Sequence, residues 1–479
     1  MKNRIITTGI TAAICGTTLS IANATIENRK PNILFIQTDD QSRWSVSAYG
    51  CENLKTPNID RLAAEGALFE NAFVDCPVCS PSRMTLLTGK HGTEVGVTDY
   101  LTYKQGLLSG ISTNHISWPN ILVQNGYTTG LIGKWHIGDS EKSLPKNNGF
   151  SYFVGNLGGG WHPKNPKFIN NDNQSKTYTG YSVDVCSDLA IDFIRENREK
   201  PFALLLNYRE PHAAYVPMPE QDMAAMKELD PVIPDYPGLP KTKVKNLMRD
   251  YLTAVRAVDR NVGRILEQIK ELGLENDTIV IYTSDHGYNM GHHGLRFKGN
   301  GYWLVKGKKG CRPNMFDTSI IVPLLIKWPG VTTPGMRITP MVSNLDTFPS
   351  VLAMLDINMP QDLNLPGKDF TPFLKGKSIK NWRDTVFGQY QMINDARDSM
   401  RMIRTADWKL IRHYKVEDKD ELYNLKSDPE ELNNLYNNPE YSKKQKQLQQ
   451  RLNDWMKGIN DDPTSISPQR IKQKKKISK

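Results

Sequence analysis

Short apolar runs rich in β-branched residues alternate with stretches of helical period over residues 31–355, and this alternation constrains the fold more than any other feature. The apolar runs predict buried strands at 32–38, 128–132, 202–208, 278–284 and 323–328. Between them, the periodicity predicts helices that include 56–66, 182–197 and 245–272. Apolar strands separated by helices are typical of an α/β fold with a large mixed, mostly parallel sheet flanked by helices.

The pattern changes after about Ser378. Alternating segments at 385–391 and 400–414 precede an amphipathic helix at 441–458, which predicts a smaller C-terminal α+β subdomain. We therefore expect a large domain over residues 25–377, the subdomain over 378–465 and a basic tail over 466–479. With 479 residues, of which 38% are hydrophobic, the chain is long enough for one large core and a smaller one.

The first 24 residues have the pattern of a signal peptide. Lys2 and Arg4 precede an apolar stretch at 5–21, and Ala-Asn-Ala at 22–24 forms a cleavage site. An anchoring helix and a lipoprotein modified at Cys15 are the alternatives. No later run reaches about 18 uninterrupted apolar residues, so we predict a periplasmic or secreted protein with no integral membrane segment after cleavage.

The charge balance favours an anionic partner. The chain has 61 Lys and Arg residues against 51 Asp and Glu, which gives a formal net charge of +10. Long-range attraction then favours encounter with nucleic acid or with a sulfated polysaccharide. Part of the excess lies in the tail, where a basic run is usually a solvated end.

Five cysteines follow the predicted cleavage site: Cys51, Cys76, Cys79, Cys186 and Cys311. They are too few for a disulfide framework in an exported chain of this size, and their odd number indicates that one has another purpose. Cys76 and Cys79 match C-x-x-C, so a redox pair is one interpretation. The residues that follow Cys79 favour a different one.

Carboxylates follow two of the predicted strands. The first strand leads into Asp39 and Asp40, and a later one leads into Asp285 and His286. Because ligands of an open α/β sheet gather at the carboxyl ends of its strands, these side chains are candidates for a divalent-cation site. Helix caps and turns are the alternative for each pair taken alone.

The segment Cys79-Ser80-Pro81-Ser82-Arg83 predicts a cysteine at the start of a helix. Proline suits the first turn, and the amino end of a helix favours an anion. Arg83 adds a planar cation with several donors nearby. A buried cysteine before a capped helix is the alternative.

This segment resembles the signature of the type I sulfatases of the alkaline-phosphatase-like superfamily. Their motif is C-x-P-S-R followed by a Thr-Gly segment, and residues 79–89 match it. Further matches come in the same order along nearly all of the mature chain, namely Asp39-Asp40, 133–136, Pro211-His212, 285–287 and 291–317. The larger domain, 25–377, is then a catalytic sulfatase domain.

The resemblance implies two cofactors. Cys79 is oxidised to formylglycine (3-oxoalanine) by a formylglycine-generating or anaerobic sulfatase-maturating enzyme, and its hydrate attacks sulfur. A calcium ion, Ca²⁺, lies at that nucleophile. Its implied ligands are Asp39, Asp40, Asp285, His286 and the residue at Cys79. Many relatives have Asn in place of His286, and histidine is a softer ligand than calcium prefers, so a hydrogen-bond donor beside the metal is the alternative for His286.

The resemblance also implies the remaining roles. Lys134 binds sulfate and the nucleophile, His136 assists sulfate release, His212 protonates the leaving alcohol, Asp285 accepts the proton of the nucleophile, and Arg83 supports the site. The residues 134 and 136 point to one face if the strand before them continues. For the second sulfate-binding cation we expect Lys298, with Arg312 as the alternative and Lys309 nearby.

The predicted function is that of an exported sulfatase, a sulfuric ester hydrolase, acting on a sulfated carbohydrate or polysaccharide rather than on nucleic acid. A phosphate or phosphonate monoester hydrolase of the same fold is one alternative. An inactive protein that binds sulfated glycans is the other. The complete set of Cys79, Arg83, Lys134, His136 and His212 favours the enzyme.

Overall fold

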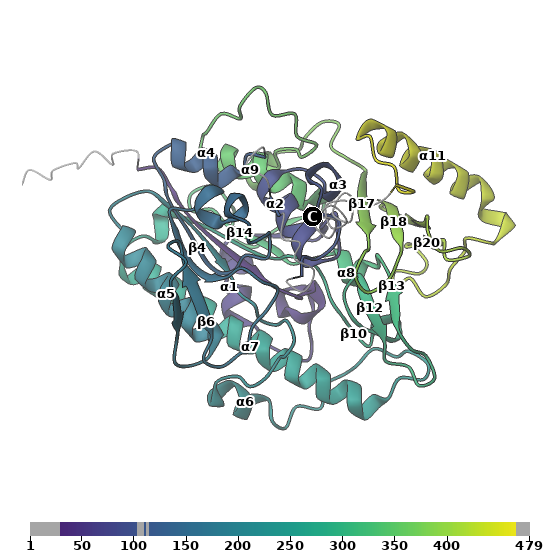
Figure 1. The fold of residues 1–479 in the computed structure, drawn as a ribbon, viewed down its shortest axis with the longest axis horizontal. Helices are drawn as coiled ribbons and strands as arrows, with labels where there is room; N and C mark the ends of the chain where they lie inside the picture. The colour runs from purple at the N-terminus through teal and green to yellow at the C-terminus, as the bar shows by residue number, and fades with distance from the viewer. Residues whose placement is uncertain (1–28, 103–109, 112–114, 466–479) are drawn as a thin grey trace, which may run out of the picture.

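A ten-stranded sheet forms the centre of the computed structural model, which describes residues 29–102, 110–111 and 115–465 (Figure 1). The signal peptide and the basic tail predicted above lie outside these residues. The four central strands are parallel and run in the order β9, β1, β8, β4. Their bounds are β1 Asn32–Thr38, β4 Thr128–Lys134, β8 Phe202–Asn207 and β9 Thr278–Ser284. These four of the five predicted strands are confirmed, although β4 continues two residues further and β8 ends one residue earlier than expected. The fifth, expected at 323–328, is β14 Leu324–Lys327.

Antiparallel pairs flank the parallel centre on both sides, so the sheet as a whole is mixed. On one side β14 pairs antiparallel with β9, and on the other β6 pairs antiparallel with β5. The remaining strands of the sheet are β2 Ala67–Phe69, β5 Tyr152–Asn156, β6 Lys167–Asn170, β7 Ser175–Thr177, β14 Leu324–Lys327 and β15 Met336–Ile338. The large, mostly parallel sheet predicted from the sequence is thus present.

Helices cover both faces of the sheet (Figure 1). Alternate residues of β1 enter different cores: Ile33 and Phe35 pack on one face, while Leu34 and Ile36 pack on the other. Period-two alternation within a strand buried on both faces explains this division. One face carries α1 Pro57–Glu65, α5 Ser182–Asn197 and α7 Lys241–Glu271. The other carries α2 Cys79–Thr88, α4 Trp118–Gln124 and α9 Thr347–Met354.

The C-terminal part has its own antiparallel sheet and core. Four strands pair in sequence order, and α11 packs Leu448 and Leu452 against Ile403 and Leu410. The elements are β17 Thr385–Gln391, β18 Ser399–Thr405, β19 Trp408–His413, β20 Glu421–Asn424 and α11 Ser442–Gly458. The segment expected at 400–414 is therefore two strands joined by a turn. This agrees with the predicted α+β subdomain, while its boundary at residue 378 stays a prediction.

A small antiparallel sheet lies between the two parts. It consists of β10 Asn289–Met290, β11 Leu295–Phe297, β12 Asn300–Trp303 and β13 Cys311–Pro313. Strands β3 Ala72–Phe73 and β16 Val342–Ser343 form another short pair. Short helices complete the fold, namely α3 Gly92–Val95, α6 Glu220–Met226, α8 Asp317–Ile320 and α10 Thr371–Leu374. Among the residues described, no helix combines the length and apolar character needed to cross a bilayer.

Candidate active site

The pairing register of β1 and β9 brings the two carboxylate pairs together. Thr38 lies opposite Ser284, and the backbone N–H of Asp285 donates to the Thr38 carbonyl at 3.1 Å. Asp39 and Asp285 therefore directly follow two neighbouring strands and lie together at the carboxyl ends of these strands. Asp40 takes a left-handed backbone conformation with φ of 66°, which turns the chain directly after the strand.

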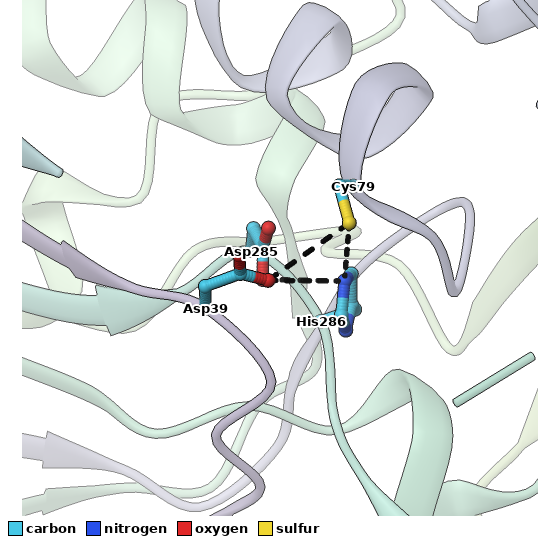
Figure 2. A group of neighbouring side chains, drawn as sticks. All are labelled: Asp39, Cys79, Asp285 and His286. Atoms are coloured by element: carbon cyan, nitrogen blue, oxygen red, sulfur yellow. Dashed lines mark hydrogen bonds and ion pairs between the residues drawn. The ribbon is translucent and has the colours of Figure 1, made fainter. Parts of the chain in front are cut away.

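Cys79 is the first residue of α2 and lies over the carboxyl ends of these strands. It is almost fully buried, with 3% of its surface exposed. Its Sγ is 3.0 Å from Lys298 Nζ, 3.4 Å from His286 Nε2 and 3.9 Å from Asp39 Oδ1. Figure 2 shows the sulfur pointing from the helix start towards Asp39, Asp285 and His286. The helix predicted to begin at this cysteine is present, with Pro81 in its first turn.

Positive charge dominates the surroundings of the thiol. Burial by itself raises the pKa of Cys79, but the charges of Lys134 and Lys298 outweigh burial and hold that pKa well below its usual value. By the same balance, Lys134 and other cations hold the pKa of Asp39 well below its normal range against the effect of burial. The site is therefore built to carry an anionic group at position 79.

Arg83 lies one helical turn after Cys79 and is fully buried. Its Nε donates to Asp285 Oδ2 at 2.9 Å, and its Nη1 donates to Gln37 Oε1 at 3.1 Å. Burial and the neighbouring Asp39 raise the pKa of Asp285 to about 6, although His286 and Arg83 oppose this shift. A carboxyl group with this pKa can accept or release a proton near neutral pH.

Lys134 is the last residue of β4, and its Nζ forms an ion pair with Asp39. The strand does not continue to His136, which has a left-handed φ of 56°. His136 Nε2 is 2.9 Å from the carbonyl oxygen of Leu101, and its Nδ1 has no hydrogen-bond partner among the described residues. Burial and the charge of Lys134 lower the pKa of His136, outweighing the opposing effect of Cys79.

His212 stands at the solvent side of the site, with 27% of its side chain exposed. Its Nδ1 is 2.6 Å from the Ala213 carbonyl oxygen, and its Nε2 is 3.8 Å from Asp40 Oδ2. Burial lowers the pKa of His212, although Asp39 and Asp40 act in the opposite direction. The histidine thus points its free nitrogen towards the carboxylates.

Of the candidate cations downstream, the structure brings Lys298 to Cys79. Lys298 lies in the tight connection of β11 to β12, and its Nζ is also 2.8 Å from Asp40 Oδ1. Arg312 instead donates to Glu421 Oε2 at 3.0 Å and places its guanidinium over the ring of Phe316. Because these partners hold Arg312 towards the C-terminal sheet, the structure does not place it beside Cys79. Lys309 is exposed.

The residues fit a hard divalent cation. Ligand atoms of Asp39, Cys79, Asp285 and His286 all lie within 4.8 Å of one another, and those of Asp39, Asp40 and His212 form a second such group. Asp40 Oδ2 is buried without a hydrogen-bond partner among the described residues. Three buried carboxylates that share a pocket repel one another unless a cation lies between them.

His286 Nδ1 is 3.0 Å from the Gly287 carbonyl oxygen. Burial lowers and Asp285 raises the pKa of His286, and the net shift is upward. Its Nε2 faces both Asp285 and Cys79, a position that suits either a ligand or a donor.

Several residues of the site were not anticipated from the sequence. Gln37 orients Arg83, and Asn207 at the end of β8 donates to the Lys134 carbonyl at 2.9 Å. Gly159 packs so closely on His136 that a Cβ there would lie 2.7 Å from the imidazole Cε1. Asn207 is the last residue of β8 and Gln37 is the last but one of β1, and this position near a strand end was the signal available. The rings of His292 and His293, a little further along the chain, pack on Trp44 and Phe316 respectively.

Comparison with known proteins identifies the family of the chain. The sequence model of the sulfatase family matches residues 31–357, which is well over half of the chain. The chain belongs to the sulfatase family. A second model, for the C-terminal region of N-sulphoglucosamine sulphohydrolase, matches residues 311–458.

Individual sulfatases resemble the chain over most of its length. An N-acetylglucosamine-6-O-sulfatase from Bacteroides thetaiotaomicron is 29% identical, over 91% of this chain and 88% of that protein. An ulvan-active sulfatase from Formosa agariphila is 27% identical, over 91% and 83% respectively. A sulfatase structure in complex with its substrate D-glucosamine-2-N,6-O-disulfate superimposes with a TM-score of 0.80 and 27% identity, covering 91% of this chain and all of that one. This sulfatase is therefore a sulfuric ester hydrolase.

Proposed function

We propose that this sulfatase removes sulfate esters from a carbohydrate, with formylglycine at position 79 and a calcium ion in the carboxylate pocket. The observation that carries the proposal is the position of the Cys79 sulfur at the start of α2, 3.0 Å from Lys298 Nζ and 3.4 Å from His286 Nε2. An amino-terminal helix end and several cations surround this one atom. The matched family signature is the second support.

The cationic residues prepare the sulfate for attack. Its negative oxygens shield the sulfur, so their charge has to be balanced before an oxygen nucleophile approaches. Lys134, Lys298 and Arg83 supply that balance from three different elements of the fold. When present, formylglycine would offer a hydrated aldehyde oxygen at the place of the Cys79 sulfur.

Asp39, Asp40 and Asp285 would hold the calcium ion, which would add positive charge beside the sulfate. His286 completes this group as a ligand or as a donor to the residue at position 79. Asp285 is also the group that would take the proton of the nucleophile, because its carboxylate faces position 79 from the end of β9.

The two histidines divide the remaining proton transfers. His212 Nδ1 donates to the Ala213 carbonyl, so Nε2 is the atom that would give a proton to the leaving alcohol when the ring is doubly protonated. Burial opposes that charged form, and Asp39 and Asp40 favour it. His136 Nε2 donates to the Leu101 carbonyl, which leaves Nδ1 with the lone pair. Since its pKa is lowered, His136 is neutral near pH 7 and serves as the base that assists sulfate release.

A carbohydrate is the substrate class we infer. The N-acetylglucosamine-6-O-sulfatase and the ulvan-active sulfatase align with 91% of this chain, whereas the steryl-sulfatase of rat aligns with 72%. The predicted signal peptide and the net charge of +10 support an exported enzyme that meets sulfated polysaccharides. Its maturation requires an enzyme that forms formylglycine.

The test is sulfate release by protein whose position 79 is verified as formylglycine by mass spectrometry. N-acetylglucosamine 6-sulfate, sulfated oligosaccharides, estrone sulfate and phenyl phosphonate are compared at equal concentration. We expect the largest kcat/KM for a sulfated sugar. Faster turnover of phenyl phosphonate or of the steroid sulfate than of every sugar sulfate would overturn the proposal.

A further inference from the structure

A loop of the C-terminal sheet reaches back to the catalytic domain. Residues 392–398 connect β17 to β18, and the N–H of Met392 donates to the Asp398 carbonyl at 2.8 Å, which closes the loop at its base. The buried carboxylate of Asp99 accepts the N–H groups of Ile393 and Asn394 at 2.8 and 3.0 Å. One side of the loop is thereby fixed to the catalytic domain.

The other side is fixed by a buried histidine. Asp398 Oδ2 is 2.6 Å from His413 Nδ1, and His413 Nε2 is 3.2 Å from Glu421 Oε1. Neither anchor involves Asp395, which lies at the middle of the loop. These contacts hold both sides of the loop without the side chain of Asp395.

Neutral donors hold the carboxylate of Asp395. Its Oδ2 accepts from Asn300 Nδ2 at 2.6 Å and from the Tyr100 hydroxyl at 3.1 Å, and its Oδ1 accepts from the Tyr302 hydroxyl at 3.0 Å. A carboxylate has about four acceptor positions, so Oδ1 keeps capacity for a further donor. The side chain is half-buried, and Tyr302 is 36% exposed. An oriented acceptor beside an accessible aromatic ring is thus available to a ligand.

Two of the hydrogen-bond partners of Asp395, Asn300 and Tyr100, are close in sequence to residues that contact the active site. Asn300 follows two residues after Lys298, whose Nζ contacts the Cys79 sulfur. Tyr100 precedes Leu101, whose carbonyl oxygen contacts His136. Through these two hydrogen bonds, Asp395 joins the segment that carries Lys298 to the segment that contacts His136. Asp395 is half-buried, whereas Cys79 is almost fully buried.

We propose that Asp395 is a specificity residue that accepts a hydrogen bond from a ring hydroxyl of the sulfated sugar, with Tyr302 contacting the sugar ring. This inference rests on the proposed function. A carboxylate near a bound sulfate repels it, so its presence favours substrates that bring a donor to it and disfavours those that do not. Sugars carry such donors around the ring, whereas steroid and nitrophenyl sulfates offer none close to the ester.

The first experiment compares two substrates in formylglycine-containing protein. We expect Asp395→Asn to lower kcat/KM for N-acetylglucosamine 6-sulfate by about 10- to 100-fold, and to change 4-nitrophenyl sulfate turnover less than about twofold. The matched control is Asp407→Asn, at an exposed aspartate in the turn between β18 and β19, for which neither substrate is affected. Tyr302→Phe keeps the ring but removes the donor to Oδ1, and it is expected to give a smaller loss on the sugar alone.

Deoxy analogues of the sulfated sugar test whether Asp395 contacts a hydroxyl of the substrate directly or only supports the structure of the site. The analogue that lacks the recognised hydroxyl is expected to lose the same factor with the wild-type enzyme and nothing further with Asp395→Asn. Equal losses on sugar and nitrophenyl sulfates, or no loss on the sugar, would overturn the role of Asp395 while leaving the proposed function intact. If verified formylglycine protein released sulfate from neither substrate, the proposed function would fall, and this inference with it.

Discussion

Lys298 Nζ lies 3.0 Å from Cys79 Sγ although 219 residues separate them along the chain. The contact depends on the small sheet β10 to β13, which folds the β11–β12 connection over the start of α2. The backbone fixes this position as well, because the N–H of Gly299 donates to the Pro77 carbonyl at 3.0 Å. A Cβ at Gly299 would lie 2.4 Å from Pro77 Cγ, so the approach requires glycine there.

Lys298→Ala is therefore expected to lower kcat/KM for any sulfate ester by about 10²–10³-fold, since it removes a cation from the reacting group. Arg312→Ala is the matched comparison. It breaks the pair with the buried Glu421 and is expected to cost about 1–3 kcal/mol of unfolding free energy, with little change in turnover. Kinetics and denaturant unfolding of both variants check this assignment. Loss of activity in Arg312→Ala alone would reverse it.

Cys79→Ala is expected to abolish turnover without unfolding the protein, because position 79 supplies the nucleophile. Cys76→Ala is expected to retain most activity. Burial and Asp75 hold the pKa of Cys76 well above its normal value, so the thiol stays protonated and unreactive. Sulfate release and thermal unfolding of both variants are the measurements. Comparable losses at the two positions would restore the redox-pair interpretation of C-x-x-C.

Removal of calcium is expected to lower both activity and melting temperature, because Asp39, Asp40 and Asp285 then repel one another in a buried pocket. At a calcium concentration 100 times Kd, binding contributes about 2.7 kcal/mol. Calorimetry after chelation and after readdition of Ca²⁺ measures this. Asp40→Asn is expected to weaken retention of the ion, and His286→Asn is expected to keep it. An unchanged melting temperature after exhaustive chelation would contradict the metal site.

The role of His212 is tested by leaving groups of different acidity. A sugar alkoxide needs a proton as it leaves, whereas nitrophenolate does not. His212→Ala is expected to slow hydrolysis of N-acetylglucosamine 6-sulfate by about 10²–10⁴-fold and that of 4-nitrophenyl sulfate far less. Formylglycine and calcium content are measured in the same samples. The same factor on both substrates would make His212 a binding residue.

Stability is expected to depend on pH through His413. Asp398 and Glu421 raise its pKa to about 9 against the effect of burial. A histidine with a raised folded-state pKa contributes fully below its unfolded pKa of about 6.5, and the contribution is lost as the pH rises through 9. The loss is on the order of 3 kcal/mol. Denaturant unfolding between pH 6 and 10 measures it, and His413→Gln is expected to flatten this part of the profile. A parallel decline in both proteins would refute the assignment.

The local pattern of the sequence was sufficient to predict the central strands and helices of the large domain. The strands at 32–38 and 278–284 and the helix at 182–197 have the predicted bounds, because apolar periodicity reports burial along a single element. The start of α2 at Cys79 was predicted from Pro81, because proline suits the first turn of a helix. The family signature added the roles expected of Cys79, Lys134 and His212.

Only the tertiary structure decided which distant side chains meet. The family resemblance favoured Lys298 over Arg312 but could not place either side chain. The pairing of β11 with β12 brings Lys298 to Cys79, and Glu421 holds Arg312 away. Likewise, only the fold brings Gln37 to Arg83, Gly159 to His136 and Asp395 to Asn300. Periodicity describes the environment of one element, whereas a site depends on register, crossing strands and loops fixed by residues far away in the chain.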